Sequence, residues 1–224
     1  NFELSPMYHS IFLEDLLDLI NITKVYPKVV NQKIVNKWIR ISKQMLRWLD
    51  IMIHPDGQIS FFNDTALEIA PSFDKLKNYF QRLGLCYNFS KFRRVEHLSD
   101  SGYLRVTSDN MVALLDVAKI GPDYIPSHAH ADTLSFELSL FGQRFMINGG
   151  TSTYEESSIR QYERSTIAHN TVAVNFVNSS QVWDKFRVAR RAYPYDLKVK
   201  NTSDIISVSS KHDGYKYLSG KPIH

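Results

Sequence analysis

Residues 133–140, TLSFELSL, alternate a polar side chain with an apolar one at every position. A period of two is typical of a strand that is buried on one face, because successive side chains of a strand point to opposite faces. Further strands are expected at residues 111–117, 144–147, 171–176, 192–199 and 205–210. We therefore expect a largely antiparallel β-domain over residues 87–224.

The first third of the chain has a helical pattern. Ser5-Pro6 is a typical helix start, since serine caps a helix and proline fits its first position. Apolar residues then recur at helical spacing as far as Pro27. A second helix is expected over residues 29–53 and a third after Pro71. The expected division is therefore a helical region over residues 1–86, followed by the β-domain.

The composition is that of a folded globular protein that could bind an acidic partner. Of the 224 residues, 43% are hydrophobic and 12% aromatic, and the net charge is +4. The basic residues are dispersed and form no nucleic-acid recognition motif, so no nucleic acid is expected as a partner. No apolar run approaches the length of a membrane span. The single cysteine, Cys86, excludes an intrachain disulfide.

The stretch HAHAD at residues 128–132 places three potential metal ligands at alternate positions. In an extended segment, His128, His130 and Asp132 would project to one side. Imidazoles two residues apart can grip one ion when a third ligand comes from elsewhere. This spacing favours a functional site over isolated structural histidines.

Two other segments carry side chains suited to chemistry on acidic sugars. Residues 160–170 contain Arg160 and Arg164, whose guanidinium forks match carboxylates and sulfates, and a further imidazole, His169. Tyr8 falls in the first turn of the first expected helix. The helix dipole favours negative charge there, so we expect a phenolate to form more easily at Tyr8.

These segments, taken in order, carry a resemblance. The motifs are ELSPMYH at residues 3–9, HAHAD at 128–132, RST at 164–166 and HNT at 169–171. Together they resemble heparinase II/III-like polysaccharide lyases. The resemblance implies an α+β multidomain fold, in which the C-terminal part of an incomplete (α/α) toroid is followed by an antiparallel β-sandwich domain. It also implies that more helices precede Asn1 in the parent protein.

The resemblance implies an activity: a carbon–oxygen lyase that cleaves a uronate-containing anionic polysaccharide by β-elimination, in the periplasm or outside the cell. Tyr8 matches the catalytic acid, which in some members is the base. His128 matches a histidine that neutralises the uronate carboxylate or accepts the proton. The residues expected to bind the substrate are His9, Tyr154, Arg160 and Arg164.

The resemblance further implies a structural zinc ion. His130 and His169 match two of its ligands. The third place, an aspartate in the family, is occupied here by Asn148. An amide is a poorer ligand than a carboxylate, and Asp132 is the alternative donor.

Two other functions are compatible with these residues. One is a non-catalytic protein on the same scaffold that binds glycans or serves polysaccharide biosynthesis or export. The other is a metal-dependent hydrolase, because HAHAD is similar to the His-x-His-x-Asp-His signature of metallo-β-lactamase-like enzymes. In this chain Thr133 stands where that signature has its last histidine.

Overall fold

The computed structural model describes residues 3–87 and 91–224, and its first part is helical. The helices there are α1 (Pro6–Val25), α2 (Gln32–Ile51) and α3 (Phe73–Arg82). The hydroxyl of Ser5 accepts the N–H of Tyr8 and caps α1, so the expected start at Ser5-Pro6 is confirmed. The second helix begins at Gln32, later than expected, because Asn31 caps it.

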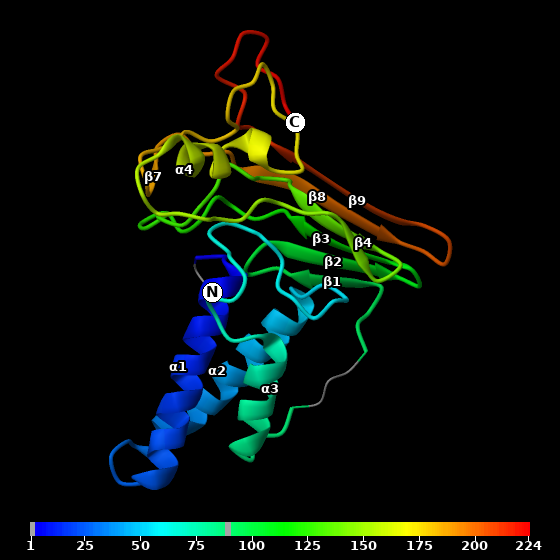
Figure 1. Ribbon diagram of the computed structural model, residues 1–224. Helices are drawn as coiled ribbons and strands as arrows, with labels where there is room; N and C mark the ends of the chain where they lie inside the picture. The colour runs from blue at the N-terminus through cyan, green and yellow to red at the C-terminus, as the bar shows by residue number, and fades with distance from the viewer. Residues whose placement is uncertain (1–2, 88–90) are drawn as a thin grey trace.

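The second part is built on an antiparallel sheet of five strands in the order β1-β2-β3-β4-β5. Each strand pairs with the next one along the chain, and the sheet lies across one end of the helical unit (Figure 1). The strands are β1 (Val95–Leu98), β2 (Tyr103–Ser108), β3 (Met111–Asp116), β4 (Phe136–Leu140) and β5 (Gln143–Met146).

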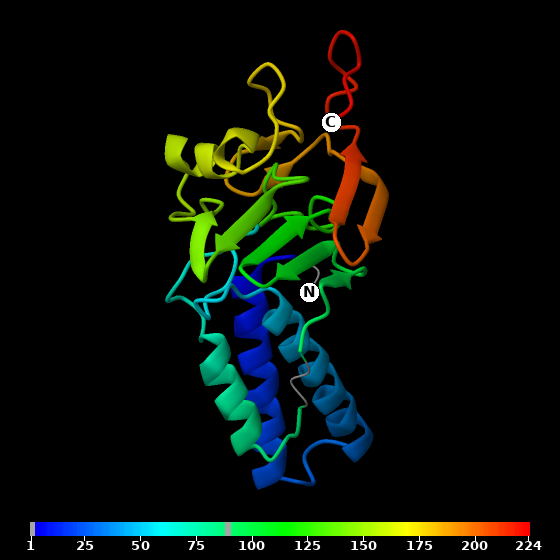
Figure 2. The ribbon, with the colours of Figure 1, turned by 90° about the vertical axis from the view of Figure 1, so that its right-hand side faces the viewer.

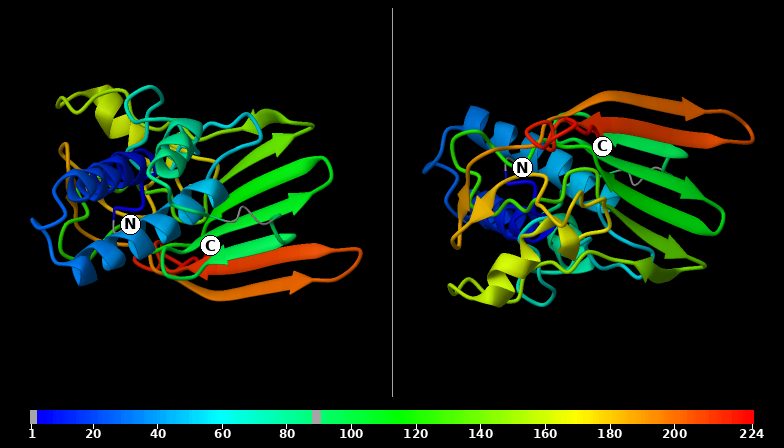
Figure 3. Two further views of the ribbon diagram at one scale, coloured as in Figure 1. Left: turned by 90° about the horizontal axis from the view of Figure 1, so that it is seen from below. Right: turned by 90° about the horizontal axis from the view of Figure 1, so that it is seen from above.

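Smaller elements flank this sheet. A hairpin of β8 (Pro194–Asn201) and β9 (Ile206–His212) lies beyond β1, and Arg94 donates to the carbonyl of Thr202 at its turn (Figure 3). At the other side the chain forms α4, a 3-10 turn and a short hairpin (Figure 2). Their bounds are α4 (Ser158–Glu163), η1 (Thr166–Ala168), β6 (Val182–Trp183) and β7 (Arg187–Val188).

Two apolar clusters hold the layers together. The first lies among α1, α2 and α3 and includes Leu17, Leu49 and Phe80, all fully buried. The second joins the helical unit to the sheet, because Trp48 of α2 packs with Tyr103 of β2. The N-terminal end of α1 and the C-terminal end of α2 therefore meet the sheet, and the segment that enters α1 is fixed against the β-domain.

The strand expected at residues 133–140 differs from the prediction in two ways. It begins only at Phe136, since Leu134 has a φ of 64°. Its polar face is the buried one: Glu137 is 0% exposed and Ser139 1%. His54 bridges these two side chains at 2.7 Å each, so burial is compensated by hydrogen bonds. The polar face of β4 thus holds the segment after α2 onto the sheet. The alternation of polar and apolar residues does not tell which face of the strand is buried.

One expected strand is wrong and several strands were not expected. Residues 171–176 form no strand, and only a single bridge joins Val174 to Val177. Asn175 and Phe176 have φ values of 52° and 58°, and two successive residues in the left-handed region interrupt regular strand geometry. Conversely, β1, β2, β6 and β7 were not expected from the sequence. Among the described residues, no helix combines the length and apolar character that crossing a bilayer requires.

Candidate active site

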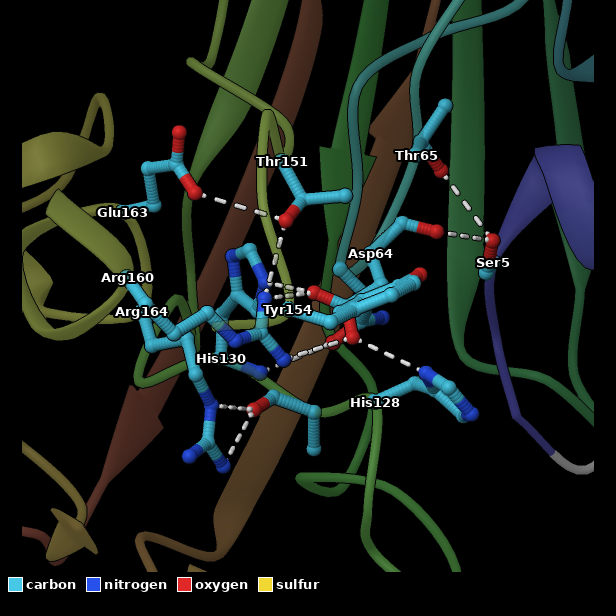
Figure 4. Close-up of polar contacts among 12 residues, drawn as sticks. Ser5, Asp64, Thr65, His128, His130, Thr151, Tyr154, Arg160, Glu163 and Arg164 are labelled. Carbon is cyan, nitrogen blue, oxygen red and sulfur yellow. Dashed lines mark hydrogen bonds and ion pairs between the residues drawn. The ribbon is translucent and has the colours of Figure 1, made fainter. Parts of the chain in front are cut away.

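A buried carboxylate, that of Asp64, lies at the centre of the site. It sits in the loop between α2 and α3, with a side chain that is 0% exposed. Nδ1 of His128 lies 2.9 Å from one of its oxygens, and Nε2 of His130 lies 2.8 Å from the other (Figure 4). The guanidinium of Arg160 donates to both oxygens, at 2.7 Å from Nη2. Three segments far apart in sequence thus converge on one carboxylate.

These contacts keep Asp64 ionised. Burial alone raises the pKa of a carboxyl group, but the hydrogen bonds from His128, His130 and Arg160 outweigh it and hold the pKa of Asp64 well below its usual range. An ionised carboxylate only accepts hydrogen bonds. His128 therefore carries a proton on Nδ1, and in the neutral ring the lone pair is on Nε2. The backbone is fixed too, since Ser5 donates to the carbonyl of Asp64 at 2.6 Å.

Tyr8 lies directly beside His128. The two ring centroids are 4.3 Å apart, and the hydroxyl of Tyr8 is 2.8 Å from that of Tyr154. Tyr8 comes from the first turn of α1, whereas Tyr154 comes from the loop after β5. The imidazole of His128 is 19% exposed, so it is reachable from solvent. Three of the residues expected from the sequence, Tyr8, His128 and Tyr154, are therefore brought together.

The electrostatics of Tyr8 differ from the expectation based on the helix dipole. Burial raises the pKa of its phenol, and the negative charge of Asp64 adds to the effect, although the hydrogen bond from Tyr154 opposes it. The difference arises because desolvation disfavours the phenolate form of Tyr8 more than the dipole at the start of α1 favours it. Tyr8 is thus held in its neutral form and is suited to donating a proton.

The two arginines expected to bind the substrate are buried, with their guanidinium groups turned inward. Both are 0% exposed. Arg160 is engaged by Asp64, and Arg164 donates to the backbone carbonyls of Ala129, Trp183, Asp184 and Arg187. In the described structure this pair therefore contacts protein atoms, and substrate binding by it stays a prediction. They brace the loops around the site because buried guanidinium donors must find acceptors inside the protein.

His9 does not join the cluster either. It points to the opposite side of α1, where its ring stacks on Trp48 at 4.3 Å and its Nε2 lies 2.8 Å from the carbonyl of Met45. Burial lowers its pKa to about 3, so the ring is neutral. Only 2% of His9 is exposed, so its expected contact with the substrate stays a prediction that the described structure does not favour.

The histidines expected to bind zinc are neighbours. Nδ1 of His130 lies 3.1 Å from Nε2 of His169, whose own Nδ1 donates to the carbonyl of Ser165 at 2.8 Å. Burial lowers the pKa of His169 to about 3. The carboxamide oxygen of Asn148 accepts the N–H of Asn170 at 3.1 Å. In the described ranges, no group of three His, Cys, Asp or Glu side chains could hold a metal ion.

These residues do not fit a three-ligand zinc site. They supply two imidazole nitrogens, and the amide at the third place is already engaged in a backbone hydrogen bond. The alternative donor, Asp132, is buried, and within the described part of the chain its Oδ2 has no hydrogen-bond partner. Burial raises its pKa to about 6. The residues present therefore do not support the zinc ion that the resemblance implies.

The family of this chain follows from a comparison with known proteins. Residues 91–224, more than half of the chain, match the sequence model described as heparinase II/III-like, C-terminal. The chain belongs to the heparinase II/III-like family. The family that the sequence motifs indicated is therefore confirmed. No curated protein matches the chain.

Solved structures of heparinases share the fold of this heparinase II/III-like chain. A heparan sulfate lyase HepC from Pedobacter heparinus is 21% identical, with a TM-score of 0.66. The match covers 96% of this chain and 34% of the lyase chain. A structure of heparinase III is 17% identical, with a TM-score of 0.71. The match covers 96% of this chain and 36% of the heparinase chain. The likeness confirms the fold class of helices followed by an antiparallel sheet. The chain spans about a third of these relatives.

The motifs of this heparinase II/III-like chain did not reveal two residues of the site. Asp64 was missed because a single aspartate in a loop carries no pattern; its one signal is the polar triplet NDT at residues 63–65 between apolar neighbours. Phe186 was missed because it lies on a turn. Its ring is 5.8 Å from that of His128 and 5.5 Å from that of Tyr154.

Proposed function

We propose that the protein containing this chain is a lyase that cleaves a uronate-containing anionic polysaccharide by β-elimination, in the periplasm or outside the cell. The observation that carries the proposal is the pairing of a neutral phenol, Tyr8, with an imidazole, His128, whose Nδ1 proton is held by Asp64. Such a pair offers an acid and a base within one small, partly exposed space.

The reaction uses these two groups in complementary roles. Nε2 of His128 takes the proton from the ring carbon beside the uronate carboxylate. The electrons of that C–H bond form the new double bond, and the bond from the neighbouring ring carbon to the glycosidic oxygen breaks. The hydroxyl of Tyr8 donates its proton to the leaving oxygen. No water is consumed, so one product carries an unsaturated uronate and the other a new hydroxyl.

Asp64 and Tyr154 support these roles. The carboxylate of Asp64 keeps His128 in the tautomer that leaves Nε2 available, as the aspartate does in a Ser-His-Asp triad. The hydroxyl of Tyr154, 2.8 Å from that of Tyr8, orients the phenol and can return a proton to it. Arg160 neutralises Asp64 and is therefore not available to the substrate carboxylate.

The experiment is an assay of the full-length parent protein on alginate, heparan sulfate and polygalacturonate. The unsaturated uronate absorbs in the ultraviolet, so its appearance reports elimination and excludes hydrolysis. We expect a signal on at least one polymer that is lost in Tyr8→Phe and in His128→Ala. A folded protein that binds one of these polymers but yields no chromophore would instead favour the non-catalytic glycan-binding role.

A further inference from the structure

The turn between β6 and β7, residues 183–187, is held in place by Arg160 of α4 and by Arg164, the residue directly after this helix. Arg160 donates to the carbonyl of Lys185 from Nε and Nη2, at 3.1 and 3.0 Å. Arg164 donates to the carbonyls of Trp183, Asp184 and Arg187 at 2.9–3.3 Å. A turn fixed by two buried guanidinium groups is preorganised, so little ordering entropy is lost when it binds a ligand.

The fixed turn presents an aromatic ring to the active site. Phe186 is 37% exposed, and its ring lies within 5.8 Å of the rings of both His128 and Tyr154. Arg160 lies beneath it, with its guanidinium carbon 5.6 Å from the ring centroid. An exposed aromatic ring with its edge at the catalytic pair offers a flat apolar surface to the C–H face of a sugar.

A groove of about 580 Å³ adjoins this ring. One wall is the turn with Phe186, and the other is residues 123–127, the segment that leads directly into His128. Arg191 fixes this second wall: it pairs with the carboxylate of Asp123 at 3.0 Å and donates to the carbonyl of Pro122 at 3.2 Å. Both walls are thus braced by arginines that are themselves engaged.

The groove also holds two cations that are not engaged. Within the described part of the chain, neither the ammonium of Lys185 nor the guanidinium of Arg187 makes a hydrogen bond or an ion pair. Arg187 lies over the ring of Trp183 at 5.8 Å. Of the two acids in the groove, Asp123 is paired with Arg191, and Asp184 accepts the N–H of Lys185 at 2.6 Å. A backbone N–H does not neutralise a carboxylate, so Asp184 keeps its charge. The groove lining holds three cations, Lys185, Arg187 and Arg191, and two acids, and its net charge is therefore positive.

We propose that this groove is a subsite for the sugar unit that adjoins the cleaved bond. Phe186 stacks on the face of that unit, and Lys185 and Arg187 bind its carboxylate or sulfate. The inference rests on the proposed function, and it assigns substrate recognition to the turn and not to the buried arginines that hold it. A rigid, partly aromatic groove with unpaired cations is suited to a polyanionic glycan, since stacking and charge act on the same sugar.

The test uses the full-length parent protein and the variants Phe186→Ala and Lys185→Ala/Arg187→Ala. Matched controls are Phe145→Ala and Lys200→Ala, which remove exposed residues of the same type on β5 and β8. We expect KM to rise roughly tenfold in both test variants. In the lysine–arginine variant kcat should stay within about twofold, because these cations bind substrate and transition state alike. Lys185→Arg should retain most of the affinity. The controls should behave as the wild type.

The outcomes separate this inference from the proposed function. If the wild type eliminates and the test variants keep its KM, the groove is not a subsite while the lyase assignment stands. If no polymer is cleaved, the affinity for heparan sulfate and alginate oligosaccharides is measured by calorimetry. Weaker binding by the lysine–arginine variant then supports the groove. Equal binding, or no binding by the folded wild type, overturns it.

Discussion

Nδ1 of His128 lies 2.9 Å from a carboxylate oxygen of Asp64, although the two residues are 64 positions apart in the chain. The same carboxylate binds Arg160 and His130, so it cannot turn away. This relationship sets the tautomer of His128 and leaves the lone pair on Nε2, the atom that acts as the base in the proposed reaction. The charge of one buried residue therefore links the fold of the loops to the chemistry of the site.

Replacing Asp64 by asparagine should remove this control. An amide offers one acceptor where the carboxylate offers two, so His128 can adopt the wrong tautomer and kcat should fall by roughly 10³–10⁴-fold. The same change leaves Arg160 as a buried, unpaired charge, at a cost of about 3–5 kcal/mol. Turnover is measured by the ultraviolet assay and stability by urea unfolding.

A suitable control for that change is Asp56→Asn, since Asp56 forms an ion pair with Arg144 at the surface. It should cost less than about 1 kcal/mol, because exposed pairs contribute little. An Asp64→Asn protein with wild-type turnover would show that the carboxylate does not orient His128.

Replacing Tyr8 by phenylalanine should lower kcat by roughly 10²–10⁴-fold, the usual effect of losing one proton-transferring group. The fold should survive, since the lost hydroxyl contacts only the hydroxyl of Tyr154 among the described residues. Tyr154→Phe keeps the catalytic phenol and should have a smaller effect. Equal losses in both variants would argue that the two hydroxyls act as one unit and not as acid and support.

His9 should make stability depend on pH. Burial lowers its pKa from 6.5 to about 3, so between these values the unfolded chain binds a proton that the folded one excludes. Stability is therefore lost as pH falls from about 6.5 towards 3, with a slope of up to about 1.4 kcal/mol per pH unit from this group. His9→Gln should flatten the dependence between pH 6 and 4, measured by urea unfolding. An unchanged slope would assign the dependence to other groups.

The metal content offers a fourth prediction. Because Asn148 supplies an engaged amide where the family has a carboxylate, we expect the purified full-length protein to contain far less than one zinc ion per chain. A chelator should leave the melting temperature unchanged. Asn148→Asp should increase the zinc content, measured by mass spectrometry of the metal. One equivalent of zinc in the wild type would mean that the two histidines recruit another donor.

The amino-acid sequence by itself determined the order of the elements and led to Tyr8 and His128, the pair of the proposed function. The period of the apolar residues separates helices from strands, and the caps at Ser5 and Asn31 are local, so short-range rules find them. The motifs around Tyr8 and His128 also carry the resemblance to the family. Local rules failed at residues 171–176, where positive φ values replace the expected strand.

Only the tertiary structure decided which polar residues meet. Asp64 has no motif, and its role arises because packing of Trp48 against Tyr103 brings the helical unit to the sheet. Tertiary contacts also bury Arg160 and Arg164, which a sequence pattern would assign to the substrate: they bind Asp64 and the turn at residues 183–187. The physical reason is that burial and charge pairing depend on contacts across long separations in the chain, whereas the sequence pattern reports only neighbours.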